Sequence, residues 1–153
     1  MNRFRVLIFI AALALFLPLQ TSAQADVEQG KILHLVQRFF QALEKQDTIA
    51  FRELCLKEAR NFAVRAIQDS IVVRSQLSTA FRFNPKRILK ERMRMPSTEI
   101  KLQGAVAMAW VPYDLWINDT FSHCGVDVFT FVQTDDGWKI SSLAYTIETD
   151  GCE

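Results

Sequence analysis

Residues 105–133 read AVAMAWVPYDLWINDTFSHCGVDVFTFVQ, two extended segments joined by the turn Asn118-Asp119. Both segments are rich in aromatic and β-branched residues, which favour strands, whereas Asn and Asp favour tight turns. Similar segments lie on either side, separated by Gln103-Gly104 and Asp135-Asp136-Gly137. Consecutive strands joined by such short turns pair antiparallel, so the sequence predicts a four-stranded meander. Its strands are expected at about 88–102, 105–116, 120–133 and 138–147.

The chain before this meander begins with helical periodicity. Apolar residues recur at helical spacing over 27–43, which predicts one long amphipathic helix whose start Asp26 can cap. Asp47 or Thr48 then caps a second, short helix that runs to about Cys55.

A hairpin and a helical turn connect these helices to the meander. The hairpin is rich in β-branched residues and is interrupted by Gln68-Asp69-Ser70, and the helical turn ends at Asn84-Pro85. Helices segregated from an antiparallel sheet indicate an α+β fold. Without internal repeats or a linker, residues 26–153 are expected to form a single domain.

Residues 1–25 have the pattern of a secretory signal peptide. Two arginines precede an unbroken apolar run over 6–17, which is shorter than the roughly 20 residues of a membrane-spanning helix. Small residues follow, so we expect cleavage after Ala23 or Ala25 and export to the periplasm or the extracellular space. An N-terminal anchor that stays uncleaved is the alternative.

Charge and motifs exclude several classes of protein. The whole chain has a formal net charge of +1, and cleavage would remove two of its 18 basic residues and none of its 17 acidic ones. A nearly neutral domain gives no reason to expect nucleic acid as a partner, or a membrane once the leader is gone. The chain has no phosphate-binding loop, no C-x-x-C pair and two widely separated histidines, so neither a metal nor another cofactor is expected.

The three cysteines differ in their surroundings. Cys55 lies in an apolar pattern, where a buried, unreactive thiol is expected. Cys152 lies in a polar tail, and a disulfide to Cys124 would tie that tail to a strand and stabilise the fold by about 3 kcal/mol. Two free thiols are the alternative. Export makes the bridge chemically possible.

The strand expected from residue 88 carries its acidic residue on one face and its basic residues on the other. Because alternate side chains share a face, Glu91 lies among Leu89, Met93 and Met95, and the basic residues lie opposite. Glu91 is therefore a candidate proton carrier on an apolar face. The basic residues suit either an anion-binding patch or a solvated sheet face. They are Lys86, Arg87, Lys90, Arg92 and Arg94.

The strand at 120–133 places His123 and Asp127 on the same face as Phe129 and Phe131. Its other face is also partly apolar, so parity alone leaves open which face points to the core. If the Phe-bearing face points inward, His123 and Asp127 line an aromatic cavity about 13 Å apart. Polar groups in such a cavity are typical of a small-molecule site, and burial would shift their pKa values, as acid–base catalysis requires. Mutually satisfied core residues are the alternative.

The neighbouring strand adds three candidates around a proline. Pro112 within a strand predicts an edge or a bulge, and a bulge can redirect Tyr113 or Asp114 into the cavity. Trp110 contributes either to that cavity or to the core. The candidate ligand-binding residues are Trp110, Tyr113, Asp114, His123 and Asp127, and the candidate catalytic residues are Glu91, His123 and Asp127.

Four motifs together resemble the secreted bacterial branch of the nuclear transport factor 2-like superfamily, members of which are labelled SnoaL-like or "putative lumazine-binding". They are WVPYD at 110–114, FSHCGVD at 121–127, DGWKI at 136–140 and the terminal GC at 151–152. The resemblance is strong over 104–152 and weak over 56–88. An arginine pair often follows the last strand's Thr in this branch, whereas Ile147-Glu148 follows Thr146 here, which argues against an anion-binding tail.

The resemblance implies a cone: a strongly curved antiparallel sheet around the long N-terminal helix, enclosing a pocket. It also implies homodimers formed through the outer sheet face, which suits the second apolar face of the 120–133 strand, Val126, Val128 and Val132. The superfamily includes isomerases, cyclases, dehydratases and binding proteins, so the fold does not choose among them.

Three functions remain open at this point. The first is a secreted protein that binds a small hydrophobic or aromatic molecule in the cone. The second is an enzyme of the isomerase, cyclase or dehydratase type, with Asp127 or Glu91 as proton carrier and His123 or Tyr113 as its partner. The third is a structural subunit whose cone is filled by its own side chains, which a cavity under about 300 Å³ would favour.

Overall fold

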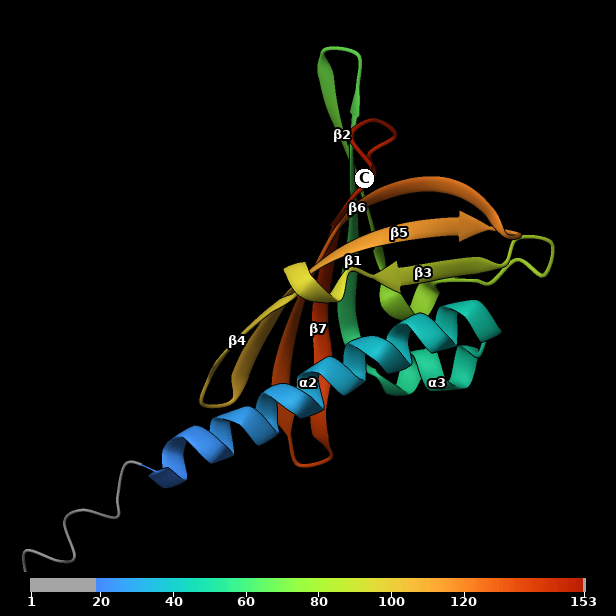
Figure 1. Ribbon diagram of the computed structural model, residues 1–153. Coiled ribbons are helices and arrows are strands. Elements are labelled where there is room, and N and C mark those ends of the chain that lie inside the picture. The colour runs from blue at the N-terminus through green and yellow to red at the C-terminus, as the bar shows by residue number, and fades with distance from the viewer. Residues whose placement is uncertain (1–18, 153) are drawn as a thin grey trace, which may run out of the picture.

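The computed structural model describes residues 19–152 (Figure 1). The apolar run of the predicted leader lies outside these residues, while Ala23 and Ala25 fall in the first turns of helix α2, Leu19–Lys45. Within the described part of the chain, no helix is long and apolar enough to cross a membrane.

The long helix predicted from the periodicity is present as α2. Ile32, Val36 and Phe39 are almost completely buried on its inner face. The prediction that Asp26 caps the helix is wrong, because α2 begins at Leu19 and Asp26 lies inside it. The second helix, α3 (Thr48–Glu53), begins where predicted.

A single side chain fixes the start of α3. The Asp47 carboxylate accepts hydrogen bonds from the backbone N–H groups of Ile49 at 3.1 Å and Ala50 at 2.9 Å. These bonds satisfy donors that the first turn of a helix otherwise leaves unpaired.

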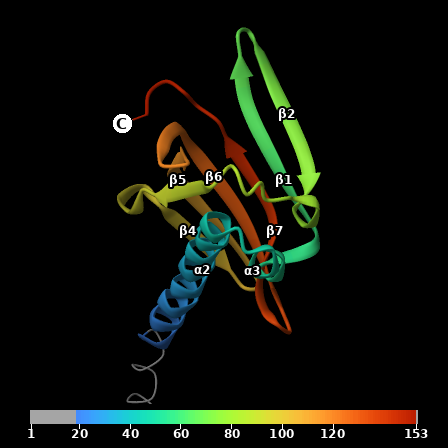
Figure 2. The same ribbon diagram turned by 90° about the vertical axis from the view of Figure 1, so that its right-hand side faces the viewer.

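Seven strands form one curved sheet in the order β2-β1-β7-β6-β5-β3, with β4 paired to β5 beside β3. Figure 2 shows the sheet with α2 and α3 on one side and the β1–β2 hairpin projecting at its end. The strands are β1 Cys55–Ile67, β2 Ser70–Leu77, β3 Leu89–Met93, β4 Glu99–Gln103, β5 Val106–Ile117, β6 Thr120–Thr134 and β7 Gly137–Thr146.

The sheet is mixed, which corrects the prediction of a purely antiparallel one. Strands joined by tight turns pair antiparallel as expected, but β1 pairs with β7 in parallel, with Asn61 opposite Leu143. The two strands are distant in sequence, so no turn sets their relative direction, and turn chemistry could not predict it.

The strand predicted at 88–102 is divided in two. A 3-10 turn, Met95–Ser97, separates β3 from β4, because Pro96 has no backbone N–H to extend the ladder. Both pieces pair with β5, on either side of Pro112, whose carbonyl accepts a hydrogen bond from the Arg94 N–H at 2.8 Å. Pro112 therefore occupies the gap between two partner strands.

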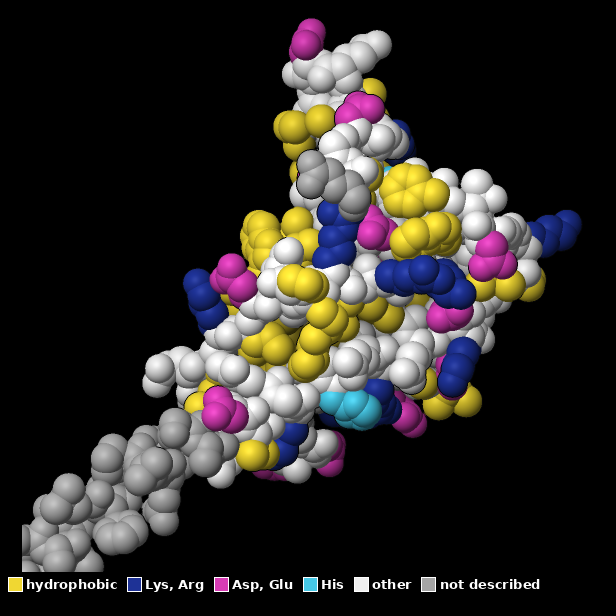
Figure 3. All heavy atoms as spheres, viewed as in Figure 1, with side chains coloured by type: hydrophobic (Ala, Val, Ile, Leu, Met, Phe, Trp, Pro, Cys, Tyr) yellow, Lys and Arg dark blue, Asp and Glu magenta, His cyan; other side chains and the backbone are white. Residues whose placement is uncertain are grey.

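The Phe-bearing face of β6 points inward. Phe129 and Phe131 are completely buried, and the Phe129 ring centroid lies 5.1 Å from that of Phe39 on α2. The other face of the sheet carries exposed apolar side chains. Figure 3 shows hydrophobic side chains gathered over the region of β4 and β5, where Val106 and Trp110 are about half exposed.

Candidate functional site

A cavity of about 300 Å³ lies between the inner face of the sheet, helices α2 and α3, and the segment that connects β2 to β3. Its volume reaches the lower limit of typical small-molecule sites, which argues against a cone filled by its own side chains. Its lining residues are Phe39, Leu43, Phe51, Asn61, Phe81, Arg82, Phe83, Asn84, Arg87, Leu89, Glu91, Tyr113, Leu115, His123, Asp127, Leu143, Tyr145 and Ile147.

Two carboxyl groups line the buried part of this cavity. Glu91 comes from β3 and Asp127 from β6, and strand β5 between them brings both to the same face of the sheet. Glu91 Oε2 and Asp127 Oδ2 are inaccessible to solvent and have no hydrogen-bond partner among the described residues. A buried polar atom without a partner is rare and costs free energy, which marks this pair as a candidate ligand-binding site.

Burial makes both carboxyl groups weaker acids than an exposed carboxyl group. It raises the pKa of Glu91 to about 8. It also raises the pKa of Asp127 well above its ordinary value, and the Glu91 charge raises it further. Burial favours the neutral form because a carboxylate loses its hydration there, and each charge disfavours the other. At neutral pH Glu91 is therefore mostly protonated and can donate a hydrogen bond, and burial favours the neutral form of Asp127 as well.

Tyr113 spans the space between these acids and the last strand. Its side chain is almost completely buried, and its hydroxyl donates a hydrogen bond to the Thr146 carbonyl at 2.7 Å. Burial raises its pKa, as do the charges of Asp127 and Glu91. Gly125 lies opposite Tyr113 in the β5–β6 ladder, where the absence of a side chain leaves room for this contact.

His123 lines the same cavity and is half-buried. Its Nδ1 lies 2.9 Å from Ser122 Oγ in a hydrogen bond, and its ring meets that of Tyr113 edge-on with centroids 6.0 Å apart. Burial lowers the pKa of His123, and the positive charges of Arg65 and Arg87 lower it further. The imidazole is therefore neutral at physiological pH.

The structure brings together four of the predicted site residues: Glu91, Tyr113, His123 and Asp127. It does not place Trp110 or Asp114 in the cavity. Both have the outward parity of β5, where Trp110 is 45% exposed and Asp114 pairs with Arg94, its Oδ2 3.1 Å from Arg94 Nε. Pro112 does not redirect them, because the irregularity in the ladder lies at Leu115/Trp116 instead.

Several lining residues were missed by the sequence analysis. Tyr145 shares the inward parity of Leu143 on β7, a signal that alternation alone could have supplied. Phe81 and Phe83 come from an irregular segment with no periodicity, and their rings pack on each other and on Phe51. No local pattern indicates that packing.

The predicted basic group separates into distinct roles. Arg87 lines the cavity together with Arg82. Lys90 lies 3.2 Å from Glu44 in an ion pair, and Arg92 stacks on the Trp116 ring. Arg94 pairs with Asp114. The basic residues of the strand therefore have separate partners, and the arginines that line the cavity are Arg82 and Arg87.

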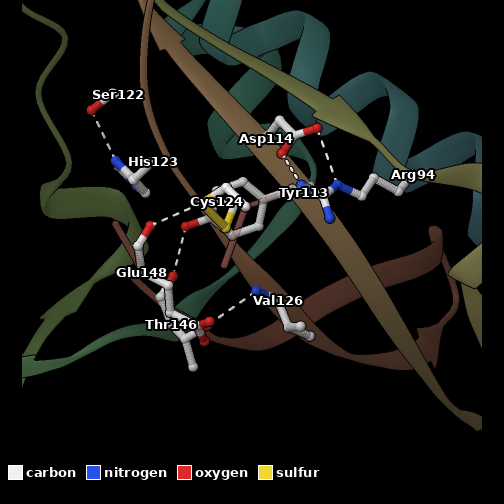
Figure 4. The surroundings of a disulfide bond; sticks show 10 residues. Arg94, Tyr113, Asp114, Ser122, His123, Cys124, Val126, Thr146 and Glu148 are labelled. Carbon is white, nitrogen blue, oxygen red and sulfur yellow. Dashed lines mark hydrogen bonds and ion pairs between the residues drawn. A yellow bond between two sulfur atoms is a disulfide. The ribbon is translucent and has the colours of Figure 1, made fainter. Parts of the chain in front are cut away.

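The predicted disulfide between Cys124 and Cys152 is present (Figure 4). Cys55 is a buried free thiol. The bridge holds the C-terminal segment against β6. There, Glu148 exchanges two backbone hydrogen bonds with Cys124, both 3.0 Å long. Thr146 Oγ1 accepts a hydrogen bond from the Val126 N–H at 3.1 Å, so the segment that also carries the Tyr113 acceptor is fixed on both sides.

Among residues 19–152, no group of three or more His, Cys, Asp or Glu side chains has an arrangement that could hold a metal ion. Apart from its two arginines, the cavity offers hydrogen-bonding groups and aromatic walls, which suit an organic molecule.

Comparison with solved structures shows the fold. A nuclear transport factor 2-like protein with a cystatin-like fold from Novosphingobium aromaticivorans is 14% identical, covering 90% of this chain and 92% of its own with a TM-score of 0.64. A superfamily member from Salmonella enterica is 14% identical, with coverages of 84% and 96% and a TM-score of 0.63.

The beta subunit of a putative aromatic-ring-hydroxylating dioxygenase from Novosphingobium aromaticivorans is 13% identical over 82% of this chain and 92% of its own, with a TM-score of 0.64. A search of curated proteins finds no match to this sequence.

Residues 27–146 match the family described as "Putative lumazine-binding". This family and the shared fold suggest a small-molecule-binding domain. The chain belongs to that family and has the nuclear transport factor 2-like fold.

Proposed function

We propose that this protein binds a small, partly aromatic molecule in the cavity, with Glu91 and Asp127 as its polar anchors. The observation that carries the proposal is the pair of inaccessible carboxyl oxygens without partners, Glu91 Oε2 and Asp127 Oδ2. Both residues line the cavity, where a ligand can hydrogen-bond to their carboxyl groups, while Phe39, Phe51 and Tyr145 supply apolar contact.

A thermal-shift screen of aromatic and carbonyl compounds tests this function. Ligands of the cavity should raise the melting temperature of the native sequence, and Asp127→Leu, which keeps the branched shape of the side chain but removes the polar anchor, should abolish that rise. Glu99→Gln, which removes an exposed acid on β4, should leave it unchanged. A broad screen without any stabilising compound, or with compounds that bind Asp127→Leu equally well, would contradict the proposal.

An acid–base enzyme is the second candidate, and one observation favours it. A carboxyl group with a pKa of about 8 can both accept and donate a proton near neutral pH, and Glu91 lies in the same cavity as Asp127, His123 and Tyr113. Proton transfer to carbon is measured by deuterium exchange from D2O into bound carbonyl compounds. Exchange that Glu91→Gln abolishes without loss of binding supports an enzyme, and binding without exchange in any bound compound supports a binding protein.

We further propose that the protein is exported after removal of residues 1–23 or 1–25. The leader pattern supports this, and the Cys124–Cys152 disulfide is compatible with an oxidising compartment. The intact mass of the protein recovered from the periplasm or medium tests both points, because it reports the cleavage site and the two hydrogens lost on bridge formation. A full-length mass in the cytoplasmic fraction would contradict export.

A further inference from the structure

We propose that the ligand is a flat aromatic acid that also carries a carbonyl group: its anionic group lies at Arg82 and Arg87, and its carbonyl accepts hydrogen bonds from Glu91 and Asp127. This inference rests on the proposed binding function and specifies the class of ligand. It follows from the separation of two kinds of polar group along one cavity.

The buried end of the cavity offers donors. Both carboxyl groups line the cavity, burial favours their protonated forms, and neither has a cationic partner among the described ion pairs. The Tyr113 hydroxyl is already committed to the Thr146 carbonyl at 2.7 Å. Neutral carboxyl groups that need a partner match an acceptor such as a carbonyl oxygen.

The entrance carries positive charge. Arg82 and Arg87 line the cavity and are exposed, and no ion pair among the described residues involves either of them. Arg82 is held in place by hydrogen bonds from Nη1 to the carbonyls of Thr79 and Phe81, both 2.9 Å long. A guanidinium oriented in this way suits a carboxylate, which it can bind through two N–H groups.

The charges around the cavity disfavour a cationic ligand. Among the described residues, the acidic side chains that line it are Glu91 and Asp127, whose charged forms burial disfavours. Burial lowers the pKa of His123, and the positive charges of Arg65 and Arg87 lower it further. The aromatic walls alone would also suit an ammonium group, but a second positive charge beside the two arginines would be repelled.

Flat, apolar rings also line the cavity. Phe51 stacks on Phe81 with ring centroids 5.3 Å apart, and Phe83 meets both rings edge-on. Planar rings make the largest contact with such walls, so an unsaturated or aromatic body joins the acidic group of the ligand to its carbonyl.

Four naphthalene probes test the two halves of this inference separately. The reference is 6-acetyl-2-naphthoate, which has both groups. 2-Acetylnaphthalene lacks the anion, 6-acetyl-2-naphthylmethylamine reverses its charge, and 6-isopropenyl-2-naphthoate replaces the carbonyl oxygen with CH2. Affinities are measured by calorimetry at pH 6.5 in 20 mM and 500 mM salt.

We expect the reference to bind about tenfold more tightly than either the neutral ketone or the isopropenyl acid, and the amine to bind weakest. High salt should reduce the advantage over the neutral ketone, since the entrance is exposed. The variant Arg82→Gln/Arg87→Gln should bind the reference compound only as tightly as it binds the neutral ketone. The control Arg74→Gln/Lys101→Gln, which removes two exposed charges outside the cavity lining, should not.

Three results would overturn the inference. If the neutral ketone bound as tightly as the reference compound and Arg82→Gln/Arg87→Gln changed neither affinity, the ligand would need no anionic group. If the isopropenyl acid bound as tightly as the reference compound, the ligand would need no carbonyl group. Failure of all four probes on folded protein would reject the ligand class, while binding of other compounds that Asp127→Leu abolishes would leave the proposed function standing.

Discussion

Gly125 lies between Tyr113 of β5 and Thr146 at the end of β7. A Cβ atom there would lie 2.3 Å from the Thr146 carbonyl oxygen, the same atom that accepts the Tyr113 hydrogen bond. Gly125→Ala must therefore displace the end of β7 or break that bond, and we expect a loss of about 2–3 kcal/mol in the free energy of unfolding. Chemical denaturation followed by circular dichroism measures it.

Gly30→Ala is the matched control for this substitution. Gly30 lies on the exposed side of α2, and nothing lies within 4 Å of a Cβ placed there. Because alanine favours a helix over glycine, this variant should gain about 1 kcal/mol. If both alanine variants behave alike, the close approach at Gly125 is not what determines the stability.

Glu91 makes the stability of the domain depend on pH. Its pKa rises from an ordinary 4.5 to about 8 on folding, so between these values the folded state retains a proton that the unfolded chain releases. The stability associated with this proton is present below about pH 4.5 and is lost as the pH rises through 8.

The variant Glu91→Gln should flatten this dependence. We expect it to raise the free energy of unfolding by about 2 kcal/mol at pH 8 and to change it little at pH 5, where Glu91 is protonated. Melting curves from pH 5 to 9 measure the effect, and Glu99→Gln should retain the native slope. Parallel curves for Glu91→Gln and the native protein would show that burial does not disfavour the charged form of Glu91.

Some of these residues were accessible to sequence reasoning and others were not. Alternation correctly placed Glu91 among apolar neighbours and put His123 and Asp127 on one face. It could not choose which face of β6 is the inner one, because that choice depends on Phe129 packing against Phe39 of a distant helix.

At the scale of elements, the C-terminal segment is the support of one cavity wall. Ile147 lines the cavity, and Glu148 and Cys152 attach the segment to Cys124. Cys124→Ser/Cys152→Ser should lower the free energy of unfolding by about 3 kcal/mol, because the bridge closes a loop of 28 residues. It should also speed hydrogen exchange at 147–152.

Reduction of the native protein provides the control for that variant. A mild reductant should reproduce the loss of stability in the native sequence and leave the double variant unchanged. Cys55 should become reactive to thiol reagents only on unfolding, because it is buried. An unchanged melting temperature after complete reduction would contradict a supporting role for the bridge.

The order of elements was predictable because turn residues and caps act locally. Asp47 caps α3 as expected, and Asn118-Asp119 turns the chain between β5 and β6. The break at Pro96 was not predicted, although proline, which has no backbone N–H, is a local signal for it. The outward position of Trp110 was not predicted, because alternation alone does not say which face of a strand points to the core.

At the scale of the whole molecule, the outer sheet face is the candidate surface for a second copy. Trp110 lies there opposite Val128 and is 45% exposed. We expect light scattering coupled to size exclusion to report a dimer for the native protein and a monomer for Trp110→Ser. Ile71→Ser, on the projecting hairpin, should remain dimeric, and a monomeric native protein would refute the prediction.

The parallel pairing of β1 with β7 has a consequence for how the chain acquires its structure. Cys55 and Ile140 are partners although about 85 residues separate them, so the sheet cannot be completed until almost the entire chain is available. Helix α2 and the β1–β2 hairpin emerge from the ribosome early but lack the strand that joins them to the rest. We expect a nascent chain of this topology to complete its fold only late in its synthesis, which is compatible with the export proposed above.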